Sequence, residues 1–587
     1  MDINSLPPEL FVWILTYLTK EELVYAKYVC KYWWKISQSQ CLWKSLNLVT
    51  FHVSNETEQQ TVLKNVLNNS DKIKYLKIPA ELLRKLLLYR DDINIVESGV
   101  KHHKPINFHN VVYLHLAKFR VYSSEIFSLI ASRCQNVKSL TFKSSTASVL
   151  MEAFQAMAEL KLEEIDITCD EDDAISTTLI KVLIENYPGL NKLSMTAFSN
   201  EEVTLILRKF KQLYSLRAPR SLVSSSSFRE MPLLTNIHQL HLDYTEIDDE
   251  SLKHISQNAP NLTFLSVLAC DGISNRGIHV VTTCCKRLEY LRIGGGEQSV
   301  TSKLSLSSIA HDCTTLKYLA SQFTYNLSRV QLARITQSCD HLFHLNLIGC
   351  DGLNDSCLEV IAEYCLMLQE ADFSYCIEIT IQGVDHILSK CVWLEKLCLS
   401  KCSGLSELQP LDTSLNQESY TGNHFQNPQI QNTESEMQTL PKAASLTEKG
   451  GTNLSSSSED STATVHTNGN EVINICQESS PVKSNQNLNS PLVHKGDNQR
   501  DKSPNQKRHS ELKILVLSSC SNLRPEVVVW ITEQCPDLRS LNLLHCHQMT
   551  SFDARMMLHG IFRNCSFLHF IPLEHNDNIY SNEKSFH

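Results

Sequence analysis

The chain has 587 residues, of which 42% are hydrophobic and 20% are charged, so most of it can form a buried core. The 54 lysines and arginines against 64 aspartates and glutamates give a net charge of −10. That balance argues against a general nucleic-acid binder, because such a protein needs a basic surface to offset phosphate charge. Only 17 glycines are present, so neither a glycine-rich phosphate loop nor a hairpin-rich β fold is expected.

The first apolar run, residues 10–15, is far too short to span a bilayer. Neither a basic leader nor a small-residue cleavage site accompanies it. We therefore expect a soluble intracellular protein, cytoplasmic or nuclear, with no membrane partner.

Residues 5–46, within an N-terminal module of residues 1–48, show helical rather than strand periodicity. Apolar side chains recur with helical spacing between residues 10 and 18, after a Pro-Pro pair that favours a helix start. Glu21 and Glu22 open a second predicted helix, where acidic side chains meet the positive end of the helix dipole. A segment this short cannot form a self-sufficient core. Part of its apolar surface is therefore expected to contact a partner.

This segment resembles the F-box along its whole length, through Leu6-Pro7-Pro8-Glu9-Leu10, Val29-Cys30-Lys31 and Leu42-Trp43 with the spacing between them. The resemblance implies docking on the Skp adaptor of a cullin–RING (SCF) ubiquitin ligase, with the cullin and RING subunits reached through Skp. It also implies an all-helical module in which Trp33 and Trp43 hold the core. The residues that it assigns to Skp binding are Leu6, Pro7, Leu10, Ile14, Leu15, Leu18 and Leu23. The alternative is a helical cap that only shields the first repeat.

A repeat of about 26 residues occupies residues 105–410 and 511–575, with the pattern Cys-x2-Leu-x2-Leu-x-Leu-x2-Cys-x2-Leu. Its Leu-x-Leu alternation predicts a short strand, and a helical face follows about ten residues later, with Asp355 as the N-cap in one copy. The last copies are predicted to begin their pattern at Leu538 and Leu568. Residues 49–104 form a linking region with a weaker opening copy around Leu76.

A strand followed by a helix in every repeat predicts an α/β solenoid, because each unit buries its apolar face only by stacking on its neighbours. We expect a horseshoe with a parallel sheet inside and helices outside. The repeats resemble the cysteine-containing leucine-rich repeats, and with the N-terminal module the chain resembles the F-box/leucine-rich-repeat (FBXL-type) proteins.

The cysteines point to packing rather than to disulfides or metal. Of 21 cysteines, fourteen fall at two fixed positions of the repeat, where a small buried thiol can meet backbone groups of a turn. The chain length disfavours a disulfide framework. His545-Cys546-His547 is compact but lacks a fourth ligand, so no metal site is predicted.

Residues 411–510 interrupt the repeats. They are rich in serine, asparagine, glutamine and threonine, and Tyr420 and Phe425 are their only aromatic residues. Such a segment cannot bury enough apolar area to offset its chain entropy, so we predict a disordered insertion on a loop. The C-terminal repeats at 511–575 and a tail at 576–587 follow.

The sequence shows no catalytic motif that would assign an enzyme, and no cofactor is predicted. The family resemblance implies a substrate-recognition subunit of an SCF ubiquitin ligase, whose repeats bind a protein substrate and promote its ubiquitination and proteasomal degradation. The middle residue of each Leu-x-Leu strand points away from the core, so the expected substrate-binding residues are Arg292, Asn346, Asp372 and Asn542. The alternatives are a repeat scaffold or inhibitor not coupled to ubiquitination, and a Skp-bound protein acting outside ubiquitination.

Overall fold

The computed structural model describes residues 3, 6–49, 69–88, 108–117, 125–144, 147–169, 176–295, 306, 309, 313–324, 327–406, 511–546, 548 and 567–569. The chain divides into two compact units, one made of residues 1–411 with 507–587 and the other of residues 412–506. All the described residues belong to the first unit. The predicted insertion and its predicted disorder lie outside them.

Four short helices form the N-terminal module: α1 (Pro8–Leu15), α2 (Lys20–Ala26), α3 (Lys31–Ser37) and α4 (Gln40–Trp43). Thr19 begins α2 with a capping box, in which its hydroxyl accepts from the Glu22 backbone N–H and its own N–H donates to the Glu22 carboxylate. Phe11 packs edge-on against Trp33 with ring centroids 4.9 Å apart. The indole N–H of Trp43 donates to the Ser37 carbonyl at 2.7 Å, so these aromatic residues form the core of the module as expected.

Within the described residues, seventeen strands form one parallel sheet and pair in chain order. They are β1 (Ser45–Asn47), β2 (Tyr75–Pro79), β3 (Tyr113–Ala117), β4 (Ser139–Ser144), β5 (Glu164–Cys169), β6 (Lys192–Met195), β7 (Ser215–Arg217), β8 (Gln239–His241), β9 (Phe264–Ser266), β10 (Tyr290–Gly294), β11 (Tyr318–Gln322), β12 (His344–Asn346), β13 (Glu370–Asp372), β14 (Lys396–Cys398), β15 (Ile514–Val516), β16 (Ser540–Asn542) and β17 (Phe567–His569).

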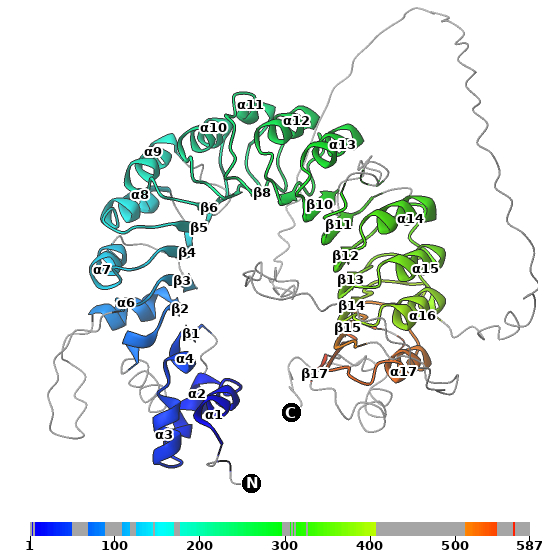
Figure 1. The fold of residues 1–587 in the computed structure, drawn as a ribbon, viewed down its shortest axis with the longest axis horizontal. Coiled ribbons are helices and arrows are strands. Elements are labelled where there is room, and N and C mark those ends of the chain that lie inside the picture. The colour runs from blue at the N-terminus through cyan, green and yellow to red at the C-terminus, as the bar shows by residue number, and fades with distance from the viewer. Residues whose placement is uncertain are drawn as a thin grey trace, which may run out of the picture. The chain divides into compact units, whose positions relative to one another are not determined.

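Helices cover one side of this sheet, and the strands line the other, inner side (Figure 1). A 3-10 turn, η2 (Ser70–Lys72), precedes the helices, which are α6 (Ala80–Leu88), α7 (Glu125–Arg133), α8 (Ala147–Ala156), α9 (Thr177–Asn186), α10 (Asn200–Lys209), α11 (Ser225–Phe228), α12 (Asp249–Asn258), α13 (Asn275–Cys284), α14 (Arg329–Ser338), α15 (Asp355–Tyr364), α16 (Ile381–Lys390) and α17 (Pro525–Glu533). The α/β leucine-rich-repeat solenoid predicted from the sequence is confirmed. Among the helices that the structure describes, none combines the length and apolarity needed to cross a bilayer.

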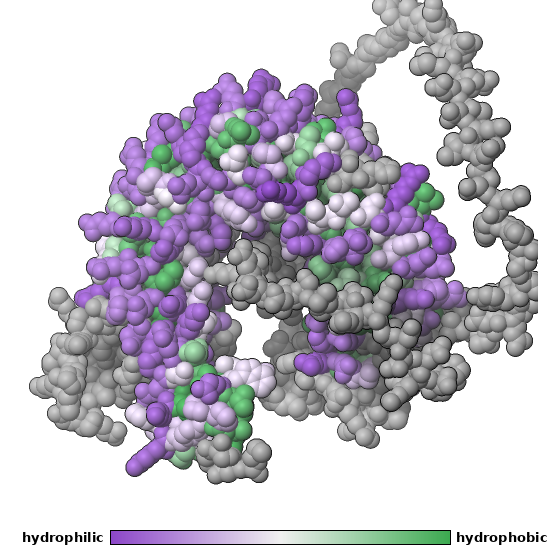
Figure 2. Space-filling view, in the orientation of Figure 1, coloured by the Kyte–Doolittle hydropathy of each residue, from purple (hydrophilic) through white to green (hydrophobic). Residues whose placement is uncertain are grey.

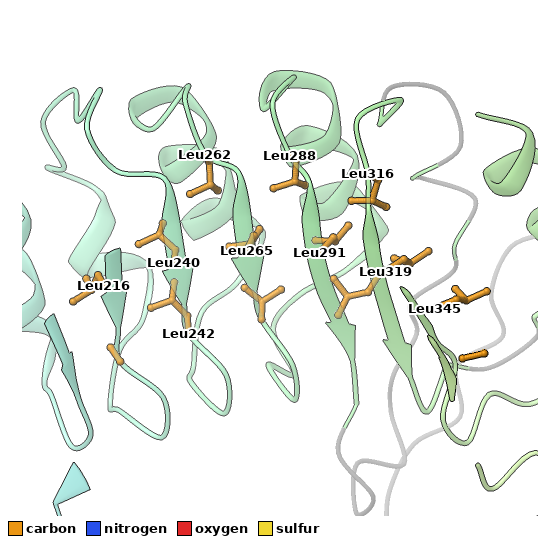
Figure 3. Close-up of a cluster of buried hydrophobic side chains, with 14 of the residues drawn as sticks. Leu216, Leu240, Leu242, Leu262, Leu265, Leu288, Leu291, Leu316, Leu319 and Leu345 are labelled. Atoms are coloured by element: carbon orange, nitrogen blue, oxygen red, sulfur yellow. The ribbon is translucent and has the colours of Figure 1, made fainter. Parts of the chain in front are cut away.

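In the part of the sheet that Figure 3 draws, the central leucines of neighbouring strands stack on one another. Leu265, Leu291 and Leu319 are paired in register and fully buried. The same register runs from Leu397 in β14 to Leu515 in β15, so the sheet continues directly across residues 407–510.

Residues 45–47, at the end of the N-terminal module, form β1, whose Leu46 pairs with Leu76; this strand was not predicted. Two details of the sequence prediction are wrong. Leu568 pairs with Leu541, so it is the central strand residue of its copy rather than the first, and the last copy had been placed three residues out of register. The N-cap of α15 is Asn354 rather than Asp355.

Asp355 instead caps the helix of the following repeat. Its carboxylate accepts the backbone N–H of Thr380 at 2.8 Å and the Thr380 hydroxyl at 2.5 Å, and Thr380 is the N-cap of α16. Gly383, in the first turn of α16, leaves room for this carboxylate, because a Cβ there would overlap Asp355 Oδ1 and lie 2.9 Å from Leu358 Cδ1. Asp249 makes the same contacts with Ser274 and lies against Gly277. The bridge therefore joins consecutive helices in two parts of the stack.

We expect Gly383→Ala to lower the free energy of unfolding by about 2 kcal/mol, because the added methyl displaces the half-buried Asp355 bridge. A glycine-to-alanine change in an open helix would instead raise the free energy of unfolding by about 1 kcal/mol. The sign of the measured change therefore distinguishes the two cases. Urea unfolding followed by circular dichroism measures it. Gly189→Ala is the control, since a Cβ there meets nothing within 4 Å; equal stability of the two variants would contradict the bridge.

The second repeat cysteine forms a thiol ladder, defined as Cys270, Cys350, Cys376, Cys402, Cys520 and Cys546. Each thiol donates to a carbonyl of the preceding repeat, at 2.8 Å from Cys350 to Ser321 and at 3.3 Å from Cys376 to Leu347. This confirms the expected contact of the thiol with backbone groups. Burial raises the pKa of Cys350 to about 11 and that of Cys376 to about 12.

The ladder thiols should resist alkylation in the folded protein. With a pKa of about 11, about one Cys350 thiol in a thousand is ionised at pH 8, and only the thiolate reacts. Iodoacetamide labelling followed by peptide mass spectrometry should therefore modify the exposed Cys30, Cys41 and Cys284 first, and Cys350 only after denaturation. Equal labelling rates in the native protein would show that the ladder opens in solution.

Candidate functional site

The outer side of α1 carries an exposed apolar stripe, which we call the α1 apolar surface: Leu10, Trp13, Ile14 and Tyr17. These side chains are 52%, 61%, 36% and 72% exposed. Leu10, Trp13 and Ile14 share one face of α1 because they lie at i, i+3 and i+4, and Tyr17 follows just after the C-cap residue Thr16. Trp13 and Tyr17 meet edge to face with ring centroids 5.3 Å apart, which orders the two largest side chains of the stripe.

The opposite side of α1 faces the core of the module. Phe11 and Leu15 are buried there, and the Tyr32 hydroxyl donates to the Leu6 carbonyl at 2.9 Å, which ties the segment before α1 to α3. The helix therefore has two apolar faces with different roles, one that holds the module together and one that contacts solvent.

The structure divides the predicted Skp-binding residues accordingly. Leu10 and Ile14 are exposed on the α1 apolar surface, and Pro7 is exposed as the N-cap of α1. Leu15 and Leu23, at 2% and 1% exposure, are packed inside the module and offer no surface to a partner. Leu6 and Leu18 are partly buried against the core.

Trp13 and Tyr17 were not singled out from the sequence. Their spacing from Leu10 and Ile14 was the available signal, but helical periodicity fits both apolar faces equally well. Only the packing of α3 against Phe11 decides which face is buried.

A second exposed apolar group lies on α2, α3 and the turn between them: Tyr25, Tyr28, Val29 and Trp34 are each about half exposed or more. Figure 2 shows hydrophobic surface exposed over the N-terminal module. A folded monomer rarely leaves this many large apolar side chains in contact with water on so small a module, and such patches mark protein-binding sites.

The module is joined to the repeats by backbone pairing rather than by a flexible linker. The Lys44 carbonyl accepts the backbone N–H groups of Lys74 at 2.9 Å and Tyr75 at 3.0 Å, and β1 pairs with β2 directly after α4. Leu42, Trp43 and Leu46 belong to the same buried cluster as the leucines of the repeats. A partner held by the module would therefore be held in a fixed relation to the first strands of the sheet.

The four predicted substrate-binding residues lie on the strand side of the sheet, but all four also have partners in the chain. Asn346 accepts the Ile348 N–H at 3.3 Å, Asp372 the Ser374 N–H at 3.1 Å, and Asn542 the Leu544 N–H at 3.0 Å. These bonds shape the turn after each strand. Arg292 lies 3.8 Å from the Asp243 carboxylate. Their contact with a substrate stays a prediction.

A row of neighbouring aromatic rings, stacked except for a tilted last pair, crosses the same face and was not found from the sequence. We call Phe264, Tyr290, Tyr318 and His344 the aromatic ladder. Successive ring centroids are 5.6, 5.8 and 5.9 Å apart, and all four side chains are half-buried. Each residue immediately precedes the central leucine of its strand, on β9 to β12. Aligning the repeats in the sequence would therefore have placed the four rings at one equivalent position.

Charged groups flank the aromatic ladder. On the β7–β10 side, burial and the positive charges of Arg217 and Arg292 lower the pKa of His241 to about 2, so this histidine is neutral. On the β13 side, the His344 ring, 3.8 Å from the Glu370 carboxylate, lowers the pKa of Glu370, whereas burial raises the pKa of Asp372. Across the described ranges, no group of three or more His, Cys, Asp or Glu side chains could hold a metal ion.

Comparison with known proteins agrees with this architecture. The F-box-like family matches residues 3–49. The Coronatine-insensitive protein homolog 1a of Oryza sativa subsp. indica is 24% identical over 319 residues, which cover 47% of this chain and 51% of the relative. F-box/LRR-repeat protein 4 of Bos taurus is 31% identical over 115 residues, 18% of each chain. The chain thus spans about half the length of the rice relative and less of the bovine one.

Among solved structures, the complex of Rad7 and Elc1 in yeast aligns with a TM-score of 0.38 and 11% identity, covering 64% of this chain and 85% of that one. The family match falls on the helical module, and the parallel β/α stack follows it directly. The chain thus combines an F-box-like module with a leucine-rich-repeat solenoid.

Proposed function

We propose that this protein is the substrate-recognition subunit of an SCF-type ubiquitin ligase. In this role the F-box-like module binds a Skp-type adaptor, through which the cullin and RING subunits are reached, and the repeats bind a protein substrate. The receptor itself catalyses nothing; it brings the substrate to a ubiquitin-charged enzyme held by the rest of the complex.

The observation that carries the proposal is the α1 apolar surface. Its four side chains point away from the module's own core, with the spacing of a helix that fits an apolar groove of a partner. The backbone pairing between the module and the sheet supports the second half of the proposal, because ubiquitin transfer needs the substrate at a defined distance from the adaptor.

Reconstitution tests the proposal. The full chain, mixed with a purified Skp-type adaptor, should elute as a stoichiometric complex in gel filtration, and adding the cullin–RING pair should shift that complex to a larger size. In cells, a bound partner should gain half-life when the cullin is inhibited. The ligase role would be contradicted if the adaptor complex did not bind the cullin, or if the half-life of the partner did not change when the cullin is inhibited.

A further inference from the structure

We propose that the aromatic ladder binds an extended segment of a partner protein whose aromatic side chains recur at i, i+2 and i+4. The faces of the partner's rings lie against the edges of the ladder rings. That this partner is the substrate rests on the proposed function; the docking chemistry itself does not. Three features of the ladder carry the inference: the way its rings stack, the length of the row and the fixed position of each ring.

The ladder presents ring edges rather than ring faces to a partner. Phe264 and Tyr290 lie at an interplanar angle of 23°, and Tyr290 and Tyr318 at 25°, so successive rings turn their faces toward one another along the row. The edge of an aromatic ring is the positive end of its quadrupole, and the face is the negative end. The face of a partner's aromatic ring therefore complements this surface electrostatically, which an aliphatic side chain cannot do.

The ladder spans four strands and is bounded at both ends. The equivalent positions on the flanking strands are Gln239 on β8 and Glu370 on β13. From β9 to β12 there are three strand intervals, or about 14 Å at about 4.8 Å each. In an extended chain, the side chains on one side recur every second residue, about 6.8 Å apart. Three alternate side chains of a partner therefore cover the whole row.

The ladder rings are held in place by their neighbours. Successive centroids are 5.6, 5.8 and 5.9 Å apart, and the His241 ring stacks on Phe264 at 4.0 Å. The four ladder side chains are half-buried, so each is both packed and open to contact. Binding therefore orders few side chains of this protein, which lowers its entropic cost.

The test measures the binding of four fluorescent peptides to the full chain by anisotropy, all with serine at the other positions. The first peptide carries phenylalanine at i, i+2 and i+4. The second has cyclohexylalanine there, which is apolar but has no ring quadrupole. The third has pentafluorophenylalanine, whose fluorine atoms reverse the quadrupole and make the ring face positive. The fourth carries phenylalanine at i, i+3 and i+6, which breaks the alternation.

The first peptide should bind at least about fivefold more tightly than each of the other three. If the burial of apolar area alone set the affinity, the cyclohexylalanine peptide would bind at least as tightly as the first. Equal binding of these two peptides, or the reverse order, would overturn the proposal. Equal binding of the two phenylalanine spacings would overturn it as well.

Variants of the ladder locate the binding. Tyr290→Leu and Tyr318→Leu, made together, remove two ring edges but keep apolar side chains, so the preference for phenylalanine over cyclohexylalanine should fall below about twofold. If this double variant does not fold, either single variant should lower the preference by about half. Tyr290→Phe and Tyr318→Phe keep both rings and should keep the preference. A preference that survives the leucine changes in folded protein, or that the phenylalanine changes abolish, would refute the site.

Tyr113→Leu is the matched control. Tyr113 is also a half-buried tyrosine of the strand face, but it lies on β3, where it stacks on Tyr75 at 4.5 Å, outside the ladder. The control variant should bind all four peptides like the original chain. An equal loss of preference in this variant would show that the peptides do not bind at the ladder.

Adaptor capture, measured on the same preparations, separates this inference from the proposed function. Peptide selectivity without adaptor capture would support the ladder as a docking site and remove the ligase role. Adaptor capture without peptide selectivity would overturn the docking site alone.

Discussion

Replacing Leu10 and Ile14 together by glutamate should reduce adaptor affinity at least about a hundredfold, the scale expected when the centre of an interface is removed. Both side chains are exposed on the α1 apolar surface, so the change places two charges against the apolar groove of the adaptor. Glutamate forms helices about as well as leucine, and exposed substitutions alter stability by only about 0.5 kcal/mol. Binding should therefore fail while the protein stays folded.

Titration calorimetry or surface capture with purified adaptor measures the loss. Leu366→Glu is the matched control, because Leu366 is 51% exposed on the repeats and outside the module; it should bind the adaptor normally. Leu15→Glu should also abolish capture, but with a lowered melting temperature, because Leu15 is buried. A Leu10/Ile14 double variant that binds like the original chain would exclude this face of α1.

Leu291→Ala should lower the free energy of unfolding of the repeats by about 3 kcal/mol, through lost burial and the cavity left behind. Leu291 is fully buried in β10, between Leu265 of β9 and Leu319 of β11. Each repeat is stabilised mainly by its neighbours, so a defect here should weaken both adjoining interfaces.

The urea midpoint, followed by circular dichroism, gives the size of this effect. Leu366→Ala makes the same chemical change at an exposed position and should change the free energy of unfolding by less than about 0.5 kcal/mol. If the two variants unfolded at the same urea concentration, the leucine stack would contribute less to stability than its burial indicates.

The repeats could be predicted from the sequence because the same spacing of apolar residues recurs in many copies. An apolar residue recurs at the equivalents of Leu291 and Leu345, and one period fits both the strand and the helix of each unit. The prediction fails at the two ends of the repeats, where a neighbouring copy is missing on one side. Leu568 lies in the last copy, so no following copy fixes its register. The strand β1 has only three residues, and its position is fixed by pairing with a strand that begins at Tyr75.

The candidate sites were predicted less completely, for physical reasons that differ between them. In α1, spacing alone could not distinguish Leu15, which is buried, from Leu10, which is exposed. On the strand face, the hydrogen bond of Asp372 to the turn depends on backbone geometry that spacing does not encode. The aromatic ladder becomes visible only after the strands are aligned.

The direct pairing of β14 with β15 makes the intervening stretch of chain a natural position for engineering. Because Leu397 and Leu515 are already neighbours, a fluorescent protein or an affinity handle placed between residues 407 and 510 should not disturb strand order. The same junction would let natural variants gain or lose length there without a cost to the leucine stack, so length differences among relatives are expected to concentrate at this point.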